Sequence, residues 1–162
     1  MPARATMAAL LAAGLGWSPA AAQEVRPIEG HENWKLGMTL AEALAAEPRA
    51  ARHACAESTC LHYADRRFPT AEVAVSAHFD AAETLDIIVI TMDVKPGDNR
   101  CQRVYAQLAA FYTAAHGETL PVSREAWIWS QPQATLSLLS QCGEGQDETI
   151  NILFESLTSQ GG

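Results

Sequence analysis

Residues Asp98–Gly117, which read DNRCQRVYAQLAAFYTAAHG, predict the main helix of this chain. Apolar and small side chains recur there at spacings of three and four residues, which places them on one broad face of a helix. Asp98 or Asn99 can cap the first turn, and Gly117 can end the helix because glycine readily adopts left-handed conformations. The expected buried face comprises Cys101, Val104, Tyr105, Leu108, Phe111, Tyr112 and Ala115.

Strand-like segments precede and follow this helix in the sequence. Glu72–Phe79 alternates apolar and polar residues, as a half-buried strand does, whereas Leu85–Val94 is apolar on both faces and is expected at the centre of a sheet. Short links within each group of strands favour antiparallel pairing. The other expected strands are Cys60–Arg66, Ala126–Ser130, Ala134–Gln141 and Thr149–Glu155.

A second, shorter helix is expected before the first strands. Thr39 and Glu42 have the spacing of a capping box, so the helix should begin at Leu40 and end before Pro48. The resulting fold class is α+β. It would be a single antiparallel sheet of about five to six strands, with one short N-terminal helix and one long helix packed on one face.

The N-terminal residues predict export. Residues 1–22 combine Arg4, an apolar stretch and the small residues Ala20–Ala22, which is the pattern of a cleaved signal peptide. The sequence therefore divides into a signal peptide at 1–22, a flexible arm at 23–34, one disulfide-stabilised domain at 35–156 and a loose tail at 157–162. The short, alanine-rich signal points to a bacterial protein of the periplasm or one that is secreted.

Charge and cysteine content narrow the possible partners and the compartment. The formal net charge of −8 disfavours nucleic acid and anionic lipid as partners. No segment of residues 23–162 has the length and apolarity of a transmembrane helix. The four cysteines of an exported chain are expected to form disulfides, and we favour Cys55–Cys60 and Cys101–Cys142 among the three possible pairings.

The segment His53–His62, HACAESTCLH, holds the densest group of reactive side chains. Two thiolates and two imidazoles suit zinc or copper(I), so His53 and His62 are candidate metal ligands. However, an oxidising compartment favours the disulfide, and the pair lacks the C-x-x-C spacing of redox centres. A structural disulfide with surface histidines is the favoured interpretation. A metal-handling or redox role for the His53, Cys55, Cys60 and His62 segment is the alternative.

The loop between Cys55 and Cys60 resembles the disulfide loop of the periplasmic lysozyme inhibitors over these residues alone. In that family the disulfide loop inserts into the lysozyme cleft, and this is the role that the resemblance implies. This chain departs from the family pattern, because it reads Ala-Glu-Ser-Thr between the cysteines where the family has a histidine next to an acidic residue. Membership is therefore not inferred.

Trp127 and Trp129 form the other candidate site. They are two positions apart on an expected strand and therefore share one of its faces. There they would form either part of the core or an aromatic patch for a sugar, peptide or protein. No G-x-S-x-G, H-E-x-x-H or P-loop motif occurs, and no catalytic residue or cofactor is assigned. The expected function is a non-catalytic binding domain that recognises a periplasmic protein or another envelope ligand.

Overall fold

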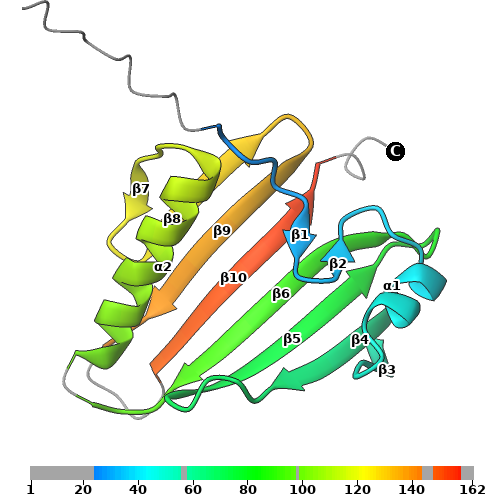
Figure 1. Cartoon of the computed structure of the whole chain (residues 1–162), viewed down its shortest axis with the longest axis horizontal. Coiled ribbons are helices and arrows are strands. Elements are labelled where there is room, and N and C mark those ends of the chain that lie inside the picture. The colour runs from blue at the N-terminus through cyan, green and yellow to red at the C-terminus, as the bar shows by residue number, and fades with distance from the viewer. Residues whose placement is uncertain (1–23, 56–57, 98, 144–147, 158–162) are drawn as a thin grey trace, which may run out of the picture.

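The computed structural model of the chain describes residues 24–55, 58–97, 99–143 and 148–157. Residues 1–22, expected to be a signal peptide, lie outside these ranges, and Leu157 is the only described residue of the expected tail. An eight-stranded antiparallel sheet dominates the fold (Figure 1). Its strands are β3 (Ala51–Cys55), β4 (Ser58–Asp65), β5 (Ala71–Phe79), β6 (Leu85–Val94), β7 (Pro121–Ser123), β8 (Ala126–Gln131), β9 (Ala134–Gln141) and β10 (Glu148–Ser156). They follow the order β3-β4-β5-β6-β10-β9-β8-β7 across the sheet.

The expectation of one sheet with five to six strands is wrong. The edge strands β3 and β7 extend the main sheet to eight strands, and β1 (Gly30–His31) pairs with β2 (Trp34–Lys35) in a separate two-stranded sheet. Nearly all residues of β3 and β7 are exposed, so these strands lack the alternation of apolar residues that identifies a half-buried strand. The part of the chain that the structure describes is therefore mostly β, with two helices.

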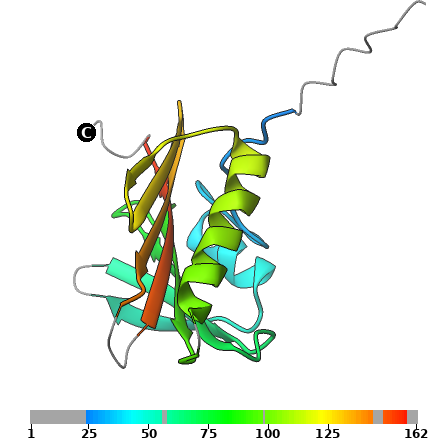
Figure 2. The same ribbon diagram turned by 90° about the vertical axis from the view of Figure 1, so that its left-hand side faces the viewer.

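Both helices lie on the same face of the main sheet (Figures 1 and 2). The shorter one, α1 (Leu40–Ala46), begins with the predicted capping box. Glu42 donates its backbone N–H to Thr39 Oγ1 at 3.3 Å, and Thr39 donates its own backbone N–H to the Glu42 carboxylate at 2.8 Å. Two backbone donors that the helix leaves free are satisfied in this way.

The longer helix, α2 (Arg100–His116), is close to the predicted span. Asn99 occupies the cap position but its side chain makes no capping hydrogen bond, while Gly117 ends the helix with a φ of 93°. Phe111 was expected on the buried face and is instead 63 % exposed, so that expectation is wrong. The buried face of α2 is therefore narrower than the sequence pattern suggested. The buried residues of α2 are Cys101, Tyr105, Ala109 and Tyr112.

The core fills the space between the helices and the sheet. Alternate strand positions are buried, and Val75, Ile88, Leu136 and Ile150 are each 0 % exposed. A disulfide joins Cys101, in the first turn of α2, to Cys142, which directly follows β9. The Cα–Cα distance is 5.5 Å. This bond fixes the start of the helix over the β9 side of the sheet.

Residues 24–34, expected as a flexible arm, contribute to the packing. Ile28 is 6 % exposed and Trp34 is 1 % exposed. Trp34 donates its indole N–H to the carbonyl of Ala43 in α1 at 2.9 Å, so this segment joins β2 to the shorter helix. Among the described residues, neither helix combines the length and apolarity needed to span a membrane.

Candidate functional site

The two faces of the main sheet differ in what covers them. We call the face that carries α1, α2 and the β1–β2 sheet the covered face, and the opposite one the open face (Figure 2). The open face is made by the strand positions that alternate with the buried ones. Strand register places these residues in rows, of which one runs Val89, Leu153, Ser137 and Ile128 across β6, β10, β9 and β8.

The open face is apolar along β6, β10, β9 and β8, and we call this part its apolar centre. Ile128 and Leu139 are each 37 % exposed there, and Ile87, Val89 and Leu153 are partly exposed beside them. By contrast, the apolar strand residues of the covered face are almost all below a tenth exposed. More apolar surface per residue is therefore accessible on the open face of the sheet than on the strands of the covered face.

Polar residues of the open face satisfy one another across the strands. Thr91 donates its hydroxyl to the Asn151 side-chain oxygen at 3.0 Å, and Thr149 donates to the Asp93 carboxylate at 3.2 Å. These cross-strand bonds lower the cost of covering the polar groups with another molecule. The open face thus combines apolar side chains with polar ones that are bonded to each other across the strands.

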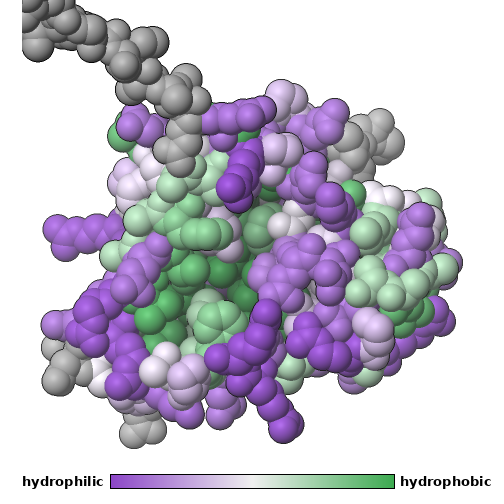
Figure 3. Space-filling model, in the orientation of Figure 1, coloured by the Kyte–Doolittle hydropathy of each residue, from purple (hydrophilic) through white to green (hydrophobic). Residues whose placement is uncertain are grey.

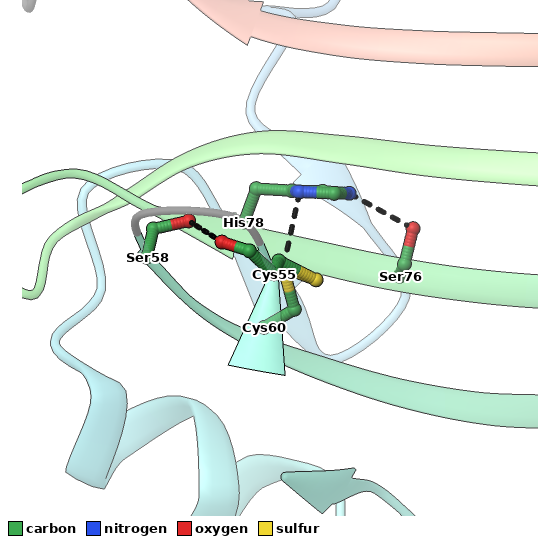
Figure 4. The surroundings of a disulfide bond; sticks show 5 residues. All are labelled: Cys55, Ser58, Cys60, Ser76 and His78. Atoms are coloured by element: carbon green, nitrogen blue, oxygen red, sulfur yellow. Dashed lines mark hydrogen bonds between the residues drawn. A yellow bond between two sulfur atoms is a disulfide. The ribbon is translucent and has the colours of Figure 1, made fainter. Parts of the chain in front are cut away.

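The cysteine and histidine cluster lies at one end of this same face. β3, β4 and β5 place His53, Cys60 and His78 in one cross-strand row, and Cys55 forms a disulfide with Cys60 at a Cα–Cα distance of 5.8 Å (Figure 4). The structure therefore has the two disulfides that the sequence favoured. Ligand atoms of Cys55, Cys60 and His78 all lie within 4.8 Å of one another.

His78 is held between two side chains. Its Nδ1 lies 3.1 Å from Cys60 Sγ, and its Nε2 lies 3.2 Å from Ser76 Oγ (Figure 4). Burial lowers the pKa of His78 from its ordinary value of 6.5, which favours the neutral form of the ring. A neutral ring has one nitrogen with a free lone pair, which is the state needed to bind a cation.

His53 and His62, the histidines singled out from the sequence, lie on the same face as the disulfide. Their rings pack edge to face with centroids 5.8 Å apart. Neither belongs to the group of described residues whose ligand atoms come within 4.8 Å of one another, and the group contains His78 in their place. Their role as metal ligands stays a prediction. His78 was not among the candidate ligands of the sequence, because its contact with Cys60 depends on the register of β4 with β5.

Trp127 and Trp129 point to the covered face, opposite Leu138 and Leu136 of β9. Their rings stack with centroids 6.0 Å apart, and Trp129 packs against Tyr112 of α2. Trp129 is only 2 % exposed, whereas Trp127 is partly exposed. Of the predicted aromatic patch, only Trp127 offers an accessible ring, and ligand binding by the pair stays a prediction.

A charged cluster on the covered face was not predicted from the sequence. Arg49 donates two hydrogen bonds to the buried Glu47 carboxylate at 2.7 Å each, and Arg67 pairs with both Asp65 and Glu32. These hydrogen bonds hold the pKa values of Glu47 and Asp65 at about 2, although burial acts in the opposite direction. An acid-x-Arg pattern at the end of α1 and again at the end of β4 is the signal that could have revealed the cluster.

The helix side also has an apolar area. Figure 3 shows a hydrophobic hollow between α2 and the β1–β2 sheet, bordered by hydrophilic residues. Farther along α2, Phe111 and Ala114 line a recess with Val25 and Pro27. Two apolar surfaces, one on each side of the sheet, are thus available for contact.

Comparisons with protein-family models, curated proteins and solved structures found no match. Any functional conclusion therefore depends on the residues of this chain alone.

Proposed function

We propose that this protein is a non-catalytic binding domain of the bacterial periplasm or extracellular space, and that it recognises a protein or another envelope ligand through the open face. The observation that carries the proposal is the apolar centre of that face, where Ile128 and Leu139 remain 37 % exposed. Contiguous apolar surface of this kind is typical of interaction sites.

A protein partner fits this face better than a small molecule does. Sites for small molecules are concave, whereas most protein interfaces are broad and combine an apolar centre with polar surroundings. The row from Val89 to Ile128 crosses four strands, so it offers a broad surface. A glycan or lipid of the cell envelope is the competing class of ligand.

The charges of the open face suggest the chemistry of the partner. Among the described strand positions that share this face, Glu72, Asp93 and Glu155 are acidic and none is Lys or Arg. The whole chain carries a formal net charge of −8. The partner should therefore present an apolar centre with Lys or Arg around it, because opposite charges favour encounter and fix orientation.

Export is supported by the predicted signal peptide and by the two disulfides. Disulfides persist in oxidising compartments such as the periplasm and are rare in the cytosol. The pair Cys101–Cys142 includes a cysteine that is 0 % exposed, which suits a permanent structural bond.

Selective capture from a periplasmic extract tests the proposal. The wild-type chain and an Ile128→Glu/Leu139→Glu variant are immobilised in equal amounts, and the bound proteins are identified by mass spectrometry. We expect at least one protein to bind the wild type and to be lost from the variant, since each substitution places a charge in the apolar centre.

A matched variant on the helix side serves as the control. Phe111 and Leu120 are 63 % and 84 % exposed, so Phe111→Glu/Leu120→Glu adds the same charge without disturbing the core. This variant should capture the same protein as the wild type. Three outcomes would contradict a protein site on the open face. They are loss of capture by the control alone, equal capture by all three chains, and recovery of glycans or lipids without protein.

A further inference from the structure

The disulfide Cys55–Cys60 has a third potential metal ligand beside it. Nδ1 of His78 lies 3.1 Å from Cys60 Sγ, and the ligand atoms of all three residues fall within 4.8 Å of one another. Two thiolates and one imidazole are the ligand set of some catalytic zinc sites, and soft sulfur ligands also favour copper(I).

Ser76 gives the histidine the orientation that such a site needs. Its hydroxyl oxygen lies 3.2 Å from His78 Nε2, on the opposite edge of the ring from the sulfur (Figure 4). When Nε2 carries the proton and donates it to Ser76, Nδ1 keeps its lone pair and directs it at the cysteines. Histidines that bind metals usually donate their second N–H to an oxygen in this way.

The strands would keep both cysteines in place without the disulfide. The β3–β4 pairing runs from Ala51 opposite His62 to Cys55 opposite Ser58, and β4 pairs with β5 from Cys60 to Asp65. The backbone ladder, as well as the S–S bond, therefore holds Cys55 and Cys60 near His78. Reduction would leave two neighbouring thiols on a sheet rather than a released loop.

We propose that reduction of Cys55–Cys60 by a dithiol turns this end of the open face into a binding site for a soft d10 cation, zinc(II) or copper(I), with Cys55, Cys60 and His78 as ligands and Ser76 as the positioning residue. The proposal concerns different residues from those of the apolar centre, so it stands or falls separately from the proposed function.

The chemistry balances with the dithiol as the reductant. Its two thiols supply two electrons and two protons, the Cys55–Cys60 bond breaks to give two thiols, and the dithiol becomes a disulfide. The cation then displaces both cysteine protons, which pass to solvent, and His78 binds through the lone pair of Nδ1. In the oxidised chain the sulfurs carry no proton to displace, and the site is closed to the cation.

Metal titration of the full chain tests the proposal. The chain is reduced with resin-bound phosphine in place of the dithiol, so that no free thiol competes for metal, and is separated from the resin without oxygen. Zinc(II) and copper(I) are titrated in parallel against chromophoric chelators. We expect one cation per reduced chain, bound at least about a hundredfold more tightly than by the oxidised chain, and the two titrations identify the preferred ion.

Variants assign the ligands. Cys55→Ala/Cys60→Ala, which keeps the other two cysteines, should abolish this binding, and His78→Ala should weaken it at least about tenfold. Ser76→Ala should weaken it by about tenfold through loss of the orienting hydrogen bond. His78→Gln provides the same test if the alanine variant does not fold, as judged by circular dichroism.

His53→Ala/His62→Ala is the matched control, because these histidines lie on the same face but outside the group of three. Its affinity should stay within about threefold of the wild type. The proposal is overturned if reduced wild type binds no more tightly than the oxidised chain or the cysteine double variant. It is also overturned if binding survives His78→Ala and is lost in the His53/His62 variant.

Discussion

Glu47 and Asp65 are buried carboxylates that each depend on an arginine. Arg49 and Arg67 hold their pKa values at about 2, below the ordinary values of 4.5 and 3.8. A carboxylate whose pKa is lower in the folded chain than in the unfolded chain stabilises the fold above the ordinary pKa. That stabilisation is lost as the pH falls toward the folded value.

The first prediction concerns this pH dependence. The melting temperature of the wild type should fall between about pH 4.5 and pH 2, and Glu47→Gln should lower it at pH 7 while flattening the acid decline. Thermal unfolding at a series of pH values measures both effects. Glu24→Gln, an exposed position, is the control and should follow the wild type. A Glu47→Gln curve parallel to that of the wild type at every pH would contradict the account.

Trp129 allows a second prediction at the residue scale. Its ring is buried against Tyr112, but its indole N–H has no hydrogen-bond partner among the described residues. Trp129→Ala should lower the free energy of unfolding by about 3–5 kcal/mol because it leaves a cavity. Trp129→Phe should cost clearly less, because it keeps most of the ring and removes an unsatisfied donor. Equal costs for the two variants in denaturant unfolding would show that this packing description is wrong.

At the scale of elements, the two disulfides should differ in their effect on stability. Cys101–Cys142 closes 41 residues and fixes α2, whereas Cys55–Cys60 closes five within one hairpin. The chain-entropy description gives about 4 kcal/mol for the longer loop and about 2 kcal/mol for the shorter one. Denaturant unfolding of the two double alanine variants checks the order. A larger loss from Cys55→Ala/Cys60→Ala would contradict it.

The sequence revealed those elements whose pattern is local. The capping box of α1, the span of α2 and the alternation in β5 all depend on residues within a few positions of one another. β3 and β7 were not predicted, because an exposed edge strand needs only backbone pairing on one side. Such a strand shows no apolar pattern in the sequence. Phe111 was misplaced because the periodicity of a helix does not show how much of it the sheet covers.

The candidate sites depended on long-range register and were harder to predict. His78 meets Cys60 only because β4 and β5 pair with those two residues opposite each other. The cluster around Arg67 brings together Glu32 and Asp65 from distant segments. Alternation did show that Trp127 and Trp129 share a face, but it did not show which face the helices cover.

For the whole molecule, placing both helices on one face leaves the opposite face as the largest uncovered part of the sheet. Its carboxylates and the net charge of −8 predict a partner with basic residues at its contact surface. Capture of that partner should weaken when the salt concentration rises from about 50 to 300 mM, because salt screens charges at the rim. Capture that is unchanged or strengthened by salt would exclude this electrostatic contribution.

Site-specific photo-crosslinking tests the central claim most directly. A photoreactive phenylalanine analogue replaces Ile128 or Leu139 on the open face, or Phe111 or Leu120 on the helix side, in the chain expressed with residues 1–22, the predicted export signal. Adducts formed on irradiation of cells are identified by mass spectrometry. We expect a protein adduct from Ile128 and Leu139 and none from the helix-side positions. Adducts from Phe111 or Leu120 alone, or no protein adduct at any position, would contradict a protein site on the open face.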